Sequence, residues 1–246
     1  MTSNQKICLI TGASSGIGKE LALQLARKGW QVIALARRED KLKELVSVQE
    51  NIIPIQCDVS NQEEVVEISA RLKKEGLIPG LFILNAGTGD VEKPGTLHRE
   101  LHQQCFDVNY FGVLNWVDQW LPTALKTKNS VFVATSSLQS VRGMPGAAAY
   151  GASKAALNHC FESLDAQYHK MGVRFSLVLP GPVNTPMLKT DDPLPATWEP
   201  EQAASYIIKK LEKGKPRIRF PLLWRGVLSF LGLLPTGLYN RLINQE

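Results

Sequence analysis

The sequence predicts a doubly wound α/β fold, with one parallel sheet that carries helices on both faces. Three features support this prediction: short apolar runs recur along the chain, helical stretches separate them, and a glycine-rich turn follows the first run. Short, continuous apolar runs are typical of parallel strands that are buried on both faces. Their alternation with helices favours ligand sites beyond the carboxyl ends of the strands.

The first half of the chain alternates strand and helix. Strands are predicted where apolar runs are bounded by turns, at residues 7–10, 32–36, 52–56 and 81–84. A helix is predicted at residues 19–28 because Leu21, Ala22 and Leu25 recur on one helical face. The charged and amphipathic stretches that complete the alternation predict helices at residues 41–46 and 62–73.

The second half continues the pattern with longer helices. A helical stretch runs over residues 98–125, and we expect a bend near Pro122 because proline removes a helical donor. A strand at residues 131–134 and a helix at residues 149–170 follow. The last predicted strand covers residues 173–179 and ends at Pro180-Gly181.

Cysteine and histidine spacing gives no sign of a metal site. The four cysteines form no CxxC pair, and the four histidines show no spacing that joins them to cysteines or carboxylates. The N-terminus leads into a strand pattern without the apolar region of a signal peptide. We therefore expect a cytoplasmic protein with free thiols and no metal ion.

The positive charge is concentrated near the C-terminus. Residues 207–246 contain eight Lys or Arg and two Asp or Glu, whereas the whole chain has a net charge of +5. The rest of the chain is therefore close to neutral. Since basic residues are not interleaved with aromatic ones on a predicted face, we expect no nucleic-acid binding.

The glycine-rich turn has the form GxxxGxG and lies between the first strand and the first helix. Glycines let the backbone approach phosphate groups closely, and the free amides at the start of the helix attract them. Such a turn can also serve only tight packing between strand and helix. Its position favours a dinucleotide site formed by Gly12, Ser14, Ser15, Gly16, Ile17 and Gly18.

The residues after the second strand indicate which dinucleotide binds. An NAD site usually has an acidic residue there, which accepts a hydrogen bond from the ribose hydroxyl. This chain has Arg37 and Arg38 instead, and two guanidinium groups favour the 2′-phosphate of NADP. The alternative is two solvated arginines at the start of a charged helix. We expect NADPH to be preferred over NADH.

Three side chains suggest proton transfer. Tyr150 and Lys154 are four residues apart on a predicted helix and so share a face, and Ser137 follows the fifth strand. Lowering the pKa of a tyrosine from about 10 to near 7 requires roughly 4 kcal/mol of preferential phenolate stabilisation. Positive charge nearby favours the phenolate. We therefore expect Lys154 to lower the pKa of Tyr150, and Ser137 to hold a substrate oxygen near the phenol.

With these motifs in order, residues 6–185 resemble the short-chain dehydrogenase/reductase family in its single-domain branch. The resemblance implies a Rossmann domain and a homodimer or homotetramer. It implies that Tyr150 is the general acid or base, that Lys154 lowers its pKa and binds the ribose, and that Ser137 orients the carbonyl oxygen. Asn109 would help to hold a water relay to the lysine. Further cofactor contacts are implied for Asp58, Val59, Asn85, Ala86, Gly87, Pro180, Gly181, Val183 and Thr185.

The predicted domain, residues 1–246, divides into three regions: a cofactor and catalytic core at 1–185, a substrate lid at 186–206 and a basic, apolar extension at 207–246. Met187, Leu188, Leu194 and Trp198 either form an apolar lid or pack beneath one. The segment 217–235 is too short and interrupted to span a bilayer. It either packs as a helix on protein, within the domain or between subunits, or lies peripherally on a membrane.

These features predict an NADPH-dependent oxidoreductase that acts on a hydrophobic ketone or aldehyde, or on a secondary alcohol. One alternative is a cofactor-binding regulatory protein with this fold and little turnover. Another is a membrane-surface protein in which the C-terminal segment carries the function.

Overall fold

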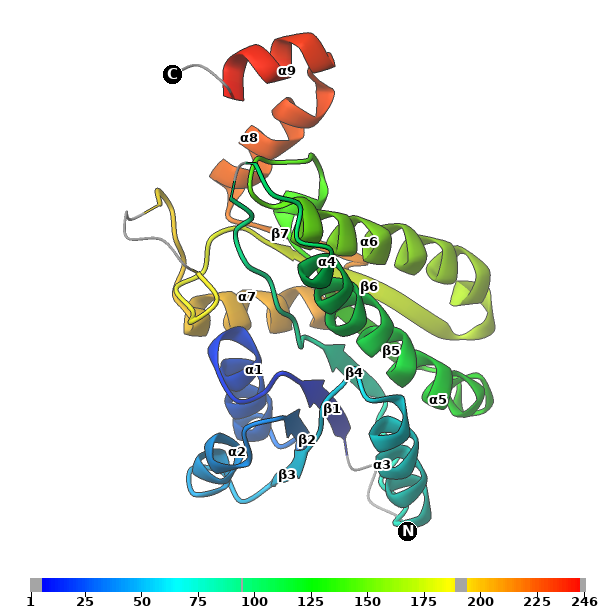
Figure 1. Ribbon diagram of the computed structural model, residues 1–246. Coiled ribbons are helices and arrows are strands. Elements are labelled where there is room, and N and C mark those ends of the chain that lie inside the picture. Colours follow the sequence, from blue (N-terminus) through cyan, green and yellow to red (C-terminus); the bar gives the residue numbers. More distant parts are fainter. Residues whose placement is uncertain (1–5, 94, 189–193, 244–246) are drawn as a thin grey trace.

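The computed structural model describes residues 6–93, 95–188 and 194–243, whose strands form one parallel sheet (Figure 1). The strand order in this seven-stranded sheet is β3-β2-β1-β4-β5-β6-β7. The strands are β1 (Ile7–Thr11), β2 (Gln31–Ala36), β3 (Ile52–Gln56), β4 (Leu81–Leu84), β5 (Ser130–Thr135), β6 (Val173–Pro180) and β7 (Arg217–Phe220). This arrangement confirms the predicted doubly wound α/β fold.

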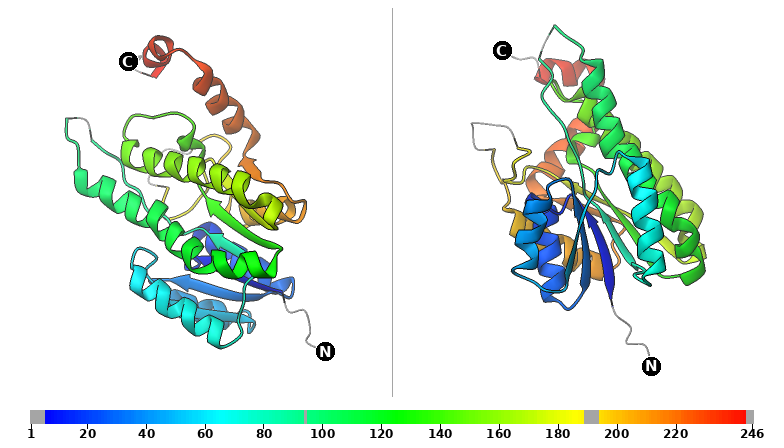
Figure 2. Two further views of the ribbon diagram at one scale, coloured as in Figure 1. Left: turned by 90° about the vertical axis from the view of Figure 1, so that its right-hand side faces the viewer. Right: turned by 60° about the horizontal axis from the view of Figure 1, so that its bottom comes forward.

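Helices cover both faces of the sheet, with α1, α2 and α7 on one face and α3, α5 and α6 on the other (Figures 1 and 2). The α-helices are α1 (Gly16–Arg27), α2 (Glu39–Val46), α3 (Gln62–Lys74), α4 (Arg99–Phe106), α5 (Gly112–Thr127), α6 (Ala148–Tyr168), α7 (Pro200–Glu212), α8 (Leu222–Leu233) and α9 (Thr236–Ile243). Short 3-10 turns lie at Leu138–Ser140 and His169–Met171.

Strands β1 to β6 each contribute to two hydrophobic cores because successive side chains point to opposite faces. In β1, Cys8 and Ile10 pack on the side of α1 and α7, whereas Leu9 packs on the side of α3 and α5. Burial on both faces explains why the strands appear in the sequence as continuous apolar runs.

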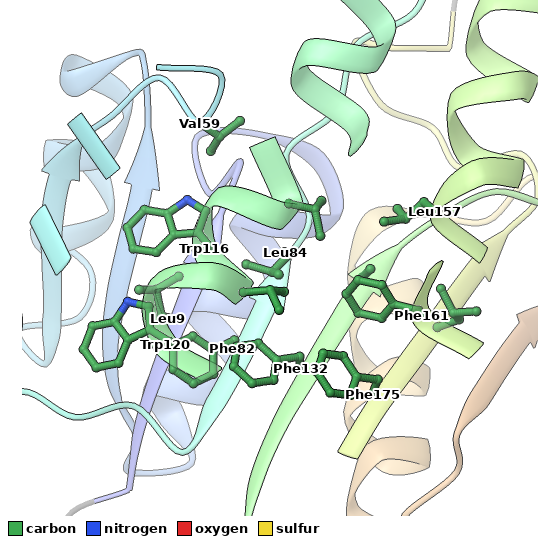
Figure 3. Packing of buried hydrophobic residues seen from close by; sticks show 14 of the residues in the cluster. Leu9, Val59, Phe82, Leu84, Trp116, Trp120, Phe132, Leu157, Phe161 and Phe175 are labelled. Atoms are coloured by element: carbon green, nitrogen blue, oxygen red, sulfur yellow. The ribbon is translucent and has the colours of Figure 1, made fainter. Parts of the chain in front are cut away.

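Aromatic residues fill the core on the α5 side (Figure 3). Phe132 of β5 stacks between Phe82 of β4 and Phe175 of β6, with ring centroids 4.5 and 5.2 Å apart. Trp120 of α5 lies over Phe82, and its indole nitrogen donates to the hydroxyl of Ser69 at 3.0 Å. These aromatic contacts pack the central strands against α5, and the Trp120–Ser69 hydrogen bond links α5 to α3.

One predicted helix differs from the structure. The stretch predicted as one helix over residues 98–125 consists of α4, a π-helical turn at Asp107–Phe111 and α5. The π-helical turn follows no proline or glycine, so sequence pattern gave no sign of it. Pro122 lies inside α5, which continues to Thr127.

The C-terminal segment also differs from the prediction. The segment predicted as one unit over residues 217–235 is not one element, because its first four residues form the edge strand β7. Ile218 and Phe220 are buried whereas Arg217 is exposed, and this short polar–apolar alternation differs from the continuous runs of the inner strands. The boundary predicted at residue 207 falls inside α7. Part of the predicted lid, residues 189–193, lies outside the described residues.

We predict that Phe132→Ala lowers the free energy of unfolding by about 3–5 kcal/mol, because it opens a cavity between two stacked rings. Urea denaturation followed by circular dichroism would measure the change. The matched control is Phe230→Ala on α8, whose side chain is 60% exposed and whose loss is expected to change stability by less than about 1 kcal/mol. Equal effects of the two substitutions would contradict the assigned core.

Candidate active site

A cavity of about 720 Å³ opens at the carboxyl ends of the central strands. It lies where the strand order reverses between β1 and β4, the usual ligand position in a doubly wound sheet. All of the predicted cofactor-binding and catalytic residues line it except Gly18 and Asn109, which lie directly behind its wall. Folding thus brings residues from distant parts of the chain, including the glycine turn and the loop after β6, to one cavity.

In the glycine turn between β1 and α1, the backbone packs so closely on neighbouring atoms that two of the glycines leave no space for a side chain. Gly12 has a φ of +67°, and a Cβ there would lie 2.8 Å from the Cα of Ala86. A Cβ on Gly18 would lie 2.3 Å from the carbonyl oxygen of Gly12. No side chain caps the start of α1, since the side chain of Ser15 makes no capping hydrogen bond. The first amides of α1 are therefore available to a phosphate group, and the turn fits a dinucleotide.

The ends of β1, β4 and β5 are joined by polar side chains. The hydroxyl of Thr11 accepts hydrogen bonds from the amides of Asn85 and Ala86, both at 3.0 Å. The hydroxyl of Thr135 donates to Oδ1 of Asn85 at 3.1 Å. These contacts hold the Asn85-Ala86-Gly87 segment against the glycine turn.

The two arginines after β2 lie at the rim of the cavity. Nη2 of Arg38 donates to the hydroxyls of Ser14 and Ser15, each at 2.8 Å. Nη1 of Arg37 lies 4.0 Å from Oδ2 of Asp58, and the Arg37 side chain is 68% exposed. Arg38 is thus held against the glycine turn, whereas Arg37 extends from the rim toward solvent. Both remain able to contact a ligand that enters from this side.

Lys154 is buried beneath the cavity floor. Its ammonium group donates to the carbonyl oxygen of Thr135 at 2.7 Å and lies 5.8 Å from the ring centroid of Tyr150. Burial lowers the pKa of Lys154 to about 8. The lysine and the tyrosine share one face of α6, as their spacing predicts.

Asn109 lies in the π-helical turn and is fully buried. Its Oδ1 accepts the backbone amide of Thr88 and its Nδ2 donates to the carbonyl oxygen of Thr88, both at 2.8 Å. The same Nδ2 donates to the hydroxyl of Ser153 at 3.0 Å. A Cβ added to Gly87 would lie 3.2 Å from Oδ1 of Asn109 and 3.4 Å from Nζ of Lys154. Asn109 therefore ties the segment after β4 to the helix that carries the lysine.

Ser137 and Tyr150 both line the cavity, with their side chains close enough for Ser137 to affect the pKa of Tyr150. The Ser137 hydroxyl accepts the backbone amide of Gln139 at 3.1 Å, which orients it. Burial raises the pKa of Tyr150, and the side chain of Ser137 opposes this effect. The effect expected of Lys154 on this pKa stays a prediction.

One end of the cavity is apolar. Residues from several separate parts of the chain form this wall: Val91, Leu138, Met187, Leu188, Leu194, Trp224 and Leu228. Three of the four predicted lid residues are among them, whereas Trp198 stacks on Phe220 at 4.9 Å, away from the cavity. Trp224 and Leu228 of α8 were not predicted, because no local pattern relates a C-terminal helix to the site.

Glu92 is a further polar residue that the sequence did not reveal. Its side chain is nearly buried and accepts the amide of Ala149, at the start of α6, at 2.9 Å. The imidazole of His102 lies 2.9 Å from its other oxygen. These contacts, led by the Ala149 hydrogen bond, lower the pKa of Glu92. Glu92 thus fixes the loop after β4 to the helix that carries Tyr150, although only tertiary contacts distinguish it from other loop carboxylates.

No three His, Cys, Asp or Glu side chains among residues 6–93, 95–188 and 194–243 are grouped so as to hold a metal ion.

Comparison with known protein families gives a match over most of the chain. The family model described as short chain dehydrogenase matches residues 6–194. An uncharacterized oxidoreductase of Myxococcus xanthus is 32% identical over 240 residues, covering 96% of this chain and 95% of the relative. The NADPH-dependent 1-acyldihydroxyacetone phosphate reductase of Saccharomyces cerevisiae is 34% identical over 199 residues, covering 78% of this chain and 66% of the relative.

Solved structures give the same result. A short chain dehydrogenase of Burkholderia cenocepacia in complex with NADP is 26% identical with a TM-score of 0.85, covering 100% of both chains. A short chain dehydrogenase/reductase of Burkholderia phymatum in complex with NAD has a TM-score of 0.82 at 22% identity, covering 92% of both chains. The second similarity concerns the fold alone.

We predict that stability depends on pH through Lys154. The folded pKa of about 8 lies below the ordinary value of 10.5, so between these values the unfolded chain holds a proton that the folded protein has released. The unfolding free energy of the protein, relative to Lys154→Met, should therefore rise with pH across this window, by up to about 1.4 kcal/mol per pH unit. Urea denaturation of both proteins from pH 7 to 10.5 would test this. A pH-independent difference would show that the lysine is not desolvated.

Proposed function

The chain belongs to the short-chain dehydrogenase/reductase family and is an oxidoreductase of that type, and from this premise we propose that it uses NADPH. In this proposal, hydride passes between NADPH and a hydrophobic ketone or aldehyde, or the corresponding alcohol. The observation that carries the proposal is the convergence of Ser137, Tyr150 and Lys154 beside an apolar wall of the same cavity.

The proposed preference for NADPH rests on the rim of the cavity. Arg37 and Arg38 supply two guanidinium groups there, and Ser14 and Ser15 add hydroxyl donors. Guanidinium groups bind phosphate through charge-assisted hydrogen bonds, whereas the NAD ribose is usually recognised by a carboxylate. The NADP complex of the Burkholderia cenocepacia protein agrees with this proposal. The Burkholderia phymatum complex holds NAD, so the arginines carry the argument.

In the proposed mechanism, the side chains of this protein orient the carbonyl and supply its proton. The nicotinamide, when bound, supplies or accepts the hydride. Ser137 donates a hydrogen bond to the carbonyl oxygen, and the phenol of Tyr150 gives that oxygen its proton during reduction. A phenol with an ordinary pKa of about 10 is protonated at neutral pH, which suits reduction. Lys154 stabilises the phenolate that forms, and Asn109 supports the water relay that returns the proton.

The proposed substrate class follows from the apolar wall. Met187, Leu194 and Trp224 approach the cavity from three separate segments, and their hydrocarbon surfaces favour an apolar substituent next to the reacting carbonyl. The named substrate of the yeast relative contains an acyl chain, which agrees with this class. A hydrophobic ketone or aldehyde would thus place its polar oxygen at Ser137 and its hydrocarbon portion against this wall.

A second candidate is a regulatory protein that binds the cofactor with little turnover. The cavity is compatible with it, since the glycine turn and the arginines at the rim would hold a cofactor whether or not turnover follows. The presence of all four proposed catalytic residues argues for the enzyme, because a protein that only binds the cofactor needs no proton donor at the carbonyl position.

We further propose the organisation that the family resemblance implies. Residues 1–185 would form the cofactor and catalytic core and residues 186–206 the substrate lid, within one cytoplasmic domain. The protein would assemble as a homodimer or homotetramer.

We predict that Tyr150→Phe lowers the rate of NADPH oxidation at least about 100-fold, because the variant cannot protonate the carbonyl oxygen. The assay would use a panel of apolar ketones and aldehydes, followed by the absorbance of NADPH. The variant should retain its NADPH affinity within about threefold, since the phenol hydroxyl contributes to chemistry more than to binding.

The same panel distinguishes the two candidate functions. Wild-type turnover that survives in Tyr150→Phe would contradict the assigned proton donor. Tight NADPH binding without turnover on any member of the panel would support the regulatory protein instead.

We predict that Arg37→Asp weakens NADPH binding by roughly 10- to 100-fold, the value of one charged hydrogen bond, and leaves NADH binding within about threefold. Isothermal titration calorimetry would measure both affinities without requiring a substrate. Lys43→Asp is the matched control, because Lys43 is an exposed cation on α2 that does not line the cavity. An equal loss in both variants would indicate general charge attraction and no specific phosphate contact.

A further inference from the structure

The last two helices of the described chain expose a large apolar surface. We define it as the C-terminal apolar surface, formed by exposed side chains of α8 and α9: Leu222, Leu223, Phe230, Leu233, Leu238 and Leu242. Phe230 is 60% exposed and Leu233 is 85% exposed. Isolated exposed apolar residues are common, but so many on two consecutive helices mark an interaction surface.

The same helices are attached to the body of the protein by their other sides. With 3.6 residues per turn, Trp224, Leu228 and Leu231 form one stripe of α8, opposite Phe230 and Leu233. Leu228 and Leu231 are buried in the main core. α9 is held by Tyr239, whose hydroxyl donates to the carbonyl oxygen of Gly143. Helices α8 and α9 therefore lie at one end of the molecule (Figure 1). Each is packed against the protein on one side and exposed on the other.

The charged residues of α8 and α9 are both arginines. Residues 222–243 contain Arg225 and Arg241, both exposed, and no Asp or Glu. A third cation, Arg142, lies with its guanidinium carbon 4.5 Å from the ring centroid of Tyr239. An apolar face with arginines and without carboxylates is complementary to a surface of hydrocarbon and negatively charged headgroups.

We propose that the C-terminal apolar surface binds peripherally to an anionic lipid membrane. A second copy of this chain fits the same surface less well. In a symmetric pair, each copy would present the same arginines to the other, and residues 222–243 contain no carboxylate to pair with them. None of the helices in the described ranges is sufficiently long and apolar to cross a bilayer, which is consistent with binding in the plane of the interface.

The position of α8 relates this surface to the cavity. Trp224 and Leu228 line the cavity from one side of α8, while Phe230 and Leu233 of the same helix are exposed on the other side. A bilayer that contacts α8 would therefore lie close to the apolar end of the cavity. If the proposed function holds, lipophilic carbonyl compounds dissolved in the membrane are its substrate class. The membrane binding itself does not depend on that function.

The test is cosedimentation of the full-length protein with phosphatidylcholine vesicles, with and without about 30% phosphatidylglycerol. We expect the protein to bind the anionic vesicles at least tenfold more strongly, and to be released by high salt. The double substitution Phe230→Glu and Leu233→Glu should reduce binding to anionic vesicles at least tenfold. The matched control, Val48→Glu with Val66→Glu, changes exposed side chains that lie just after α2 and on α3, and these helices are at the opposite end of the molecule in Figure 1. This control should bind as the unchanged protein does.

Three results would overturn the proposal. The unchanged protein could remain in the supernatant with anionic vesicles, or the Phe230/Leu233 variant could bind like the unchanged protein. The third result would come from sedimentation velocity without vesicles. If the unchanged protein were an oligomer and the Phe230/Leu233 variant a monomer, the surface would hold a second copy of the chain. Circular dichroism would establish that each variant is folded. Tyr150→Phe should bind vesicles normally, which separates failure of this proposal from failure of the proposed enzyme activity.

Discussion

A continuous set of hydrogen bonds joins the glycine turn to the buried lysine, and the geometry of the site depends on it. The hydroxyl of Thr11 accepts the amides of Asn85 and Ala86, Asn85 accepts the hydroxyl of Thr135, and the carbonyl oxygen of Thr135 accepts the ammonium of Lys154. These groups lie on β1, β4, β5 and α6, at the edge where all parallel strands end. Because every member is held by the next, the glycine turn and the lysine keep a defined separation.

Burial sets the electrostatics of this arrangement. Desolvation disfavours charge, so it lowers the pKa of Lys154 and raises that of Tyr150. Burial therefore disfavours the charged form of each side chain, the ammonium of Lys154 and the phenolate of Tyr150. A negatively charged ligand in the cavity would favour the ammonium form again. The polar end of the cavity therefore favours an anionic ligand. The start of α1, which no side chain caps, favours an anion as well.

The apolar end of the cavity is not held together by such a network of hydrogen bonds. Its residues come from loops and from α8, and they are not hydrogen-bonded to one another across the space they line. Met187 and Trp224 both line it although they are distant in the chain. The indole nitrogen of Trp224 donates to the carbonyl oxygen of Pro195 at 2.6 Å, which attaches α8 to the segment after residue 193. A movement of α8 would therefore alter the apolar wall while leaving the hydrogen-bonded polar end unchanged.

The sequence alone determined the features that depend on local geometry. The inner strands were predictable because burial on both faces requires continuous apolar runs, and Tyr150 and Lys154 because a helix places residues four apart on one face. The glycine turn was predictable because close backbone contact excludes a side chain. Tertiary structure alone decided the edge strand β7, the position of Glu92 at the start of α6, and the use of Trp224 in the cavity wall. These features arise from packing between segments far apart in the chain, which leaves no periodic pattern in the sequence.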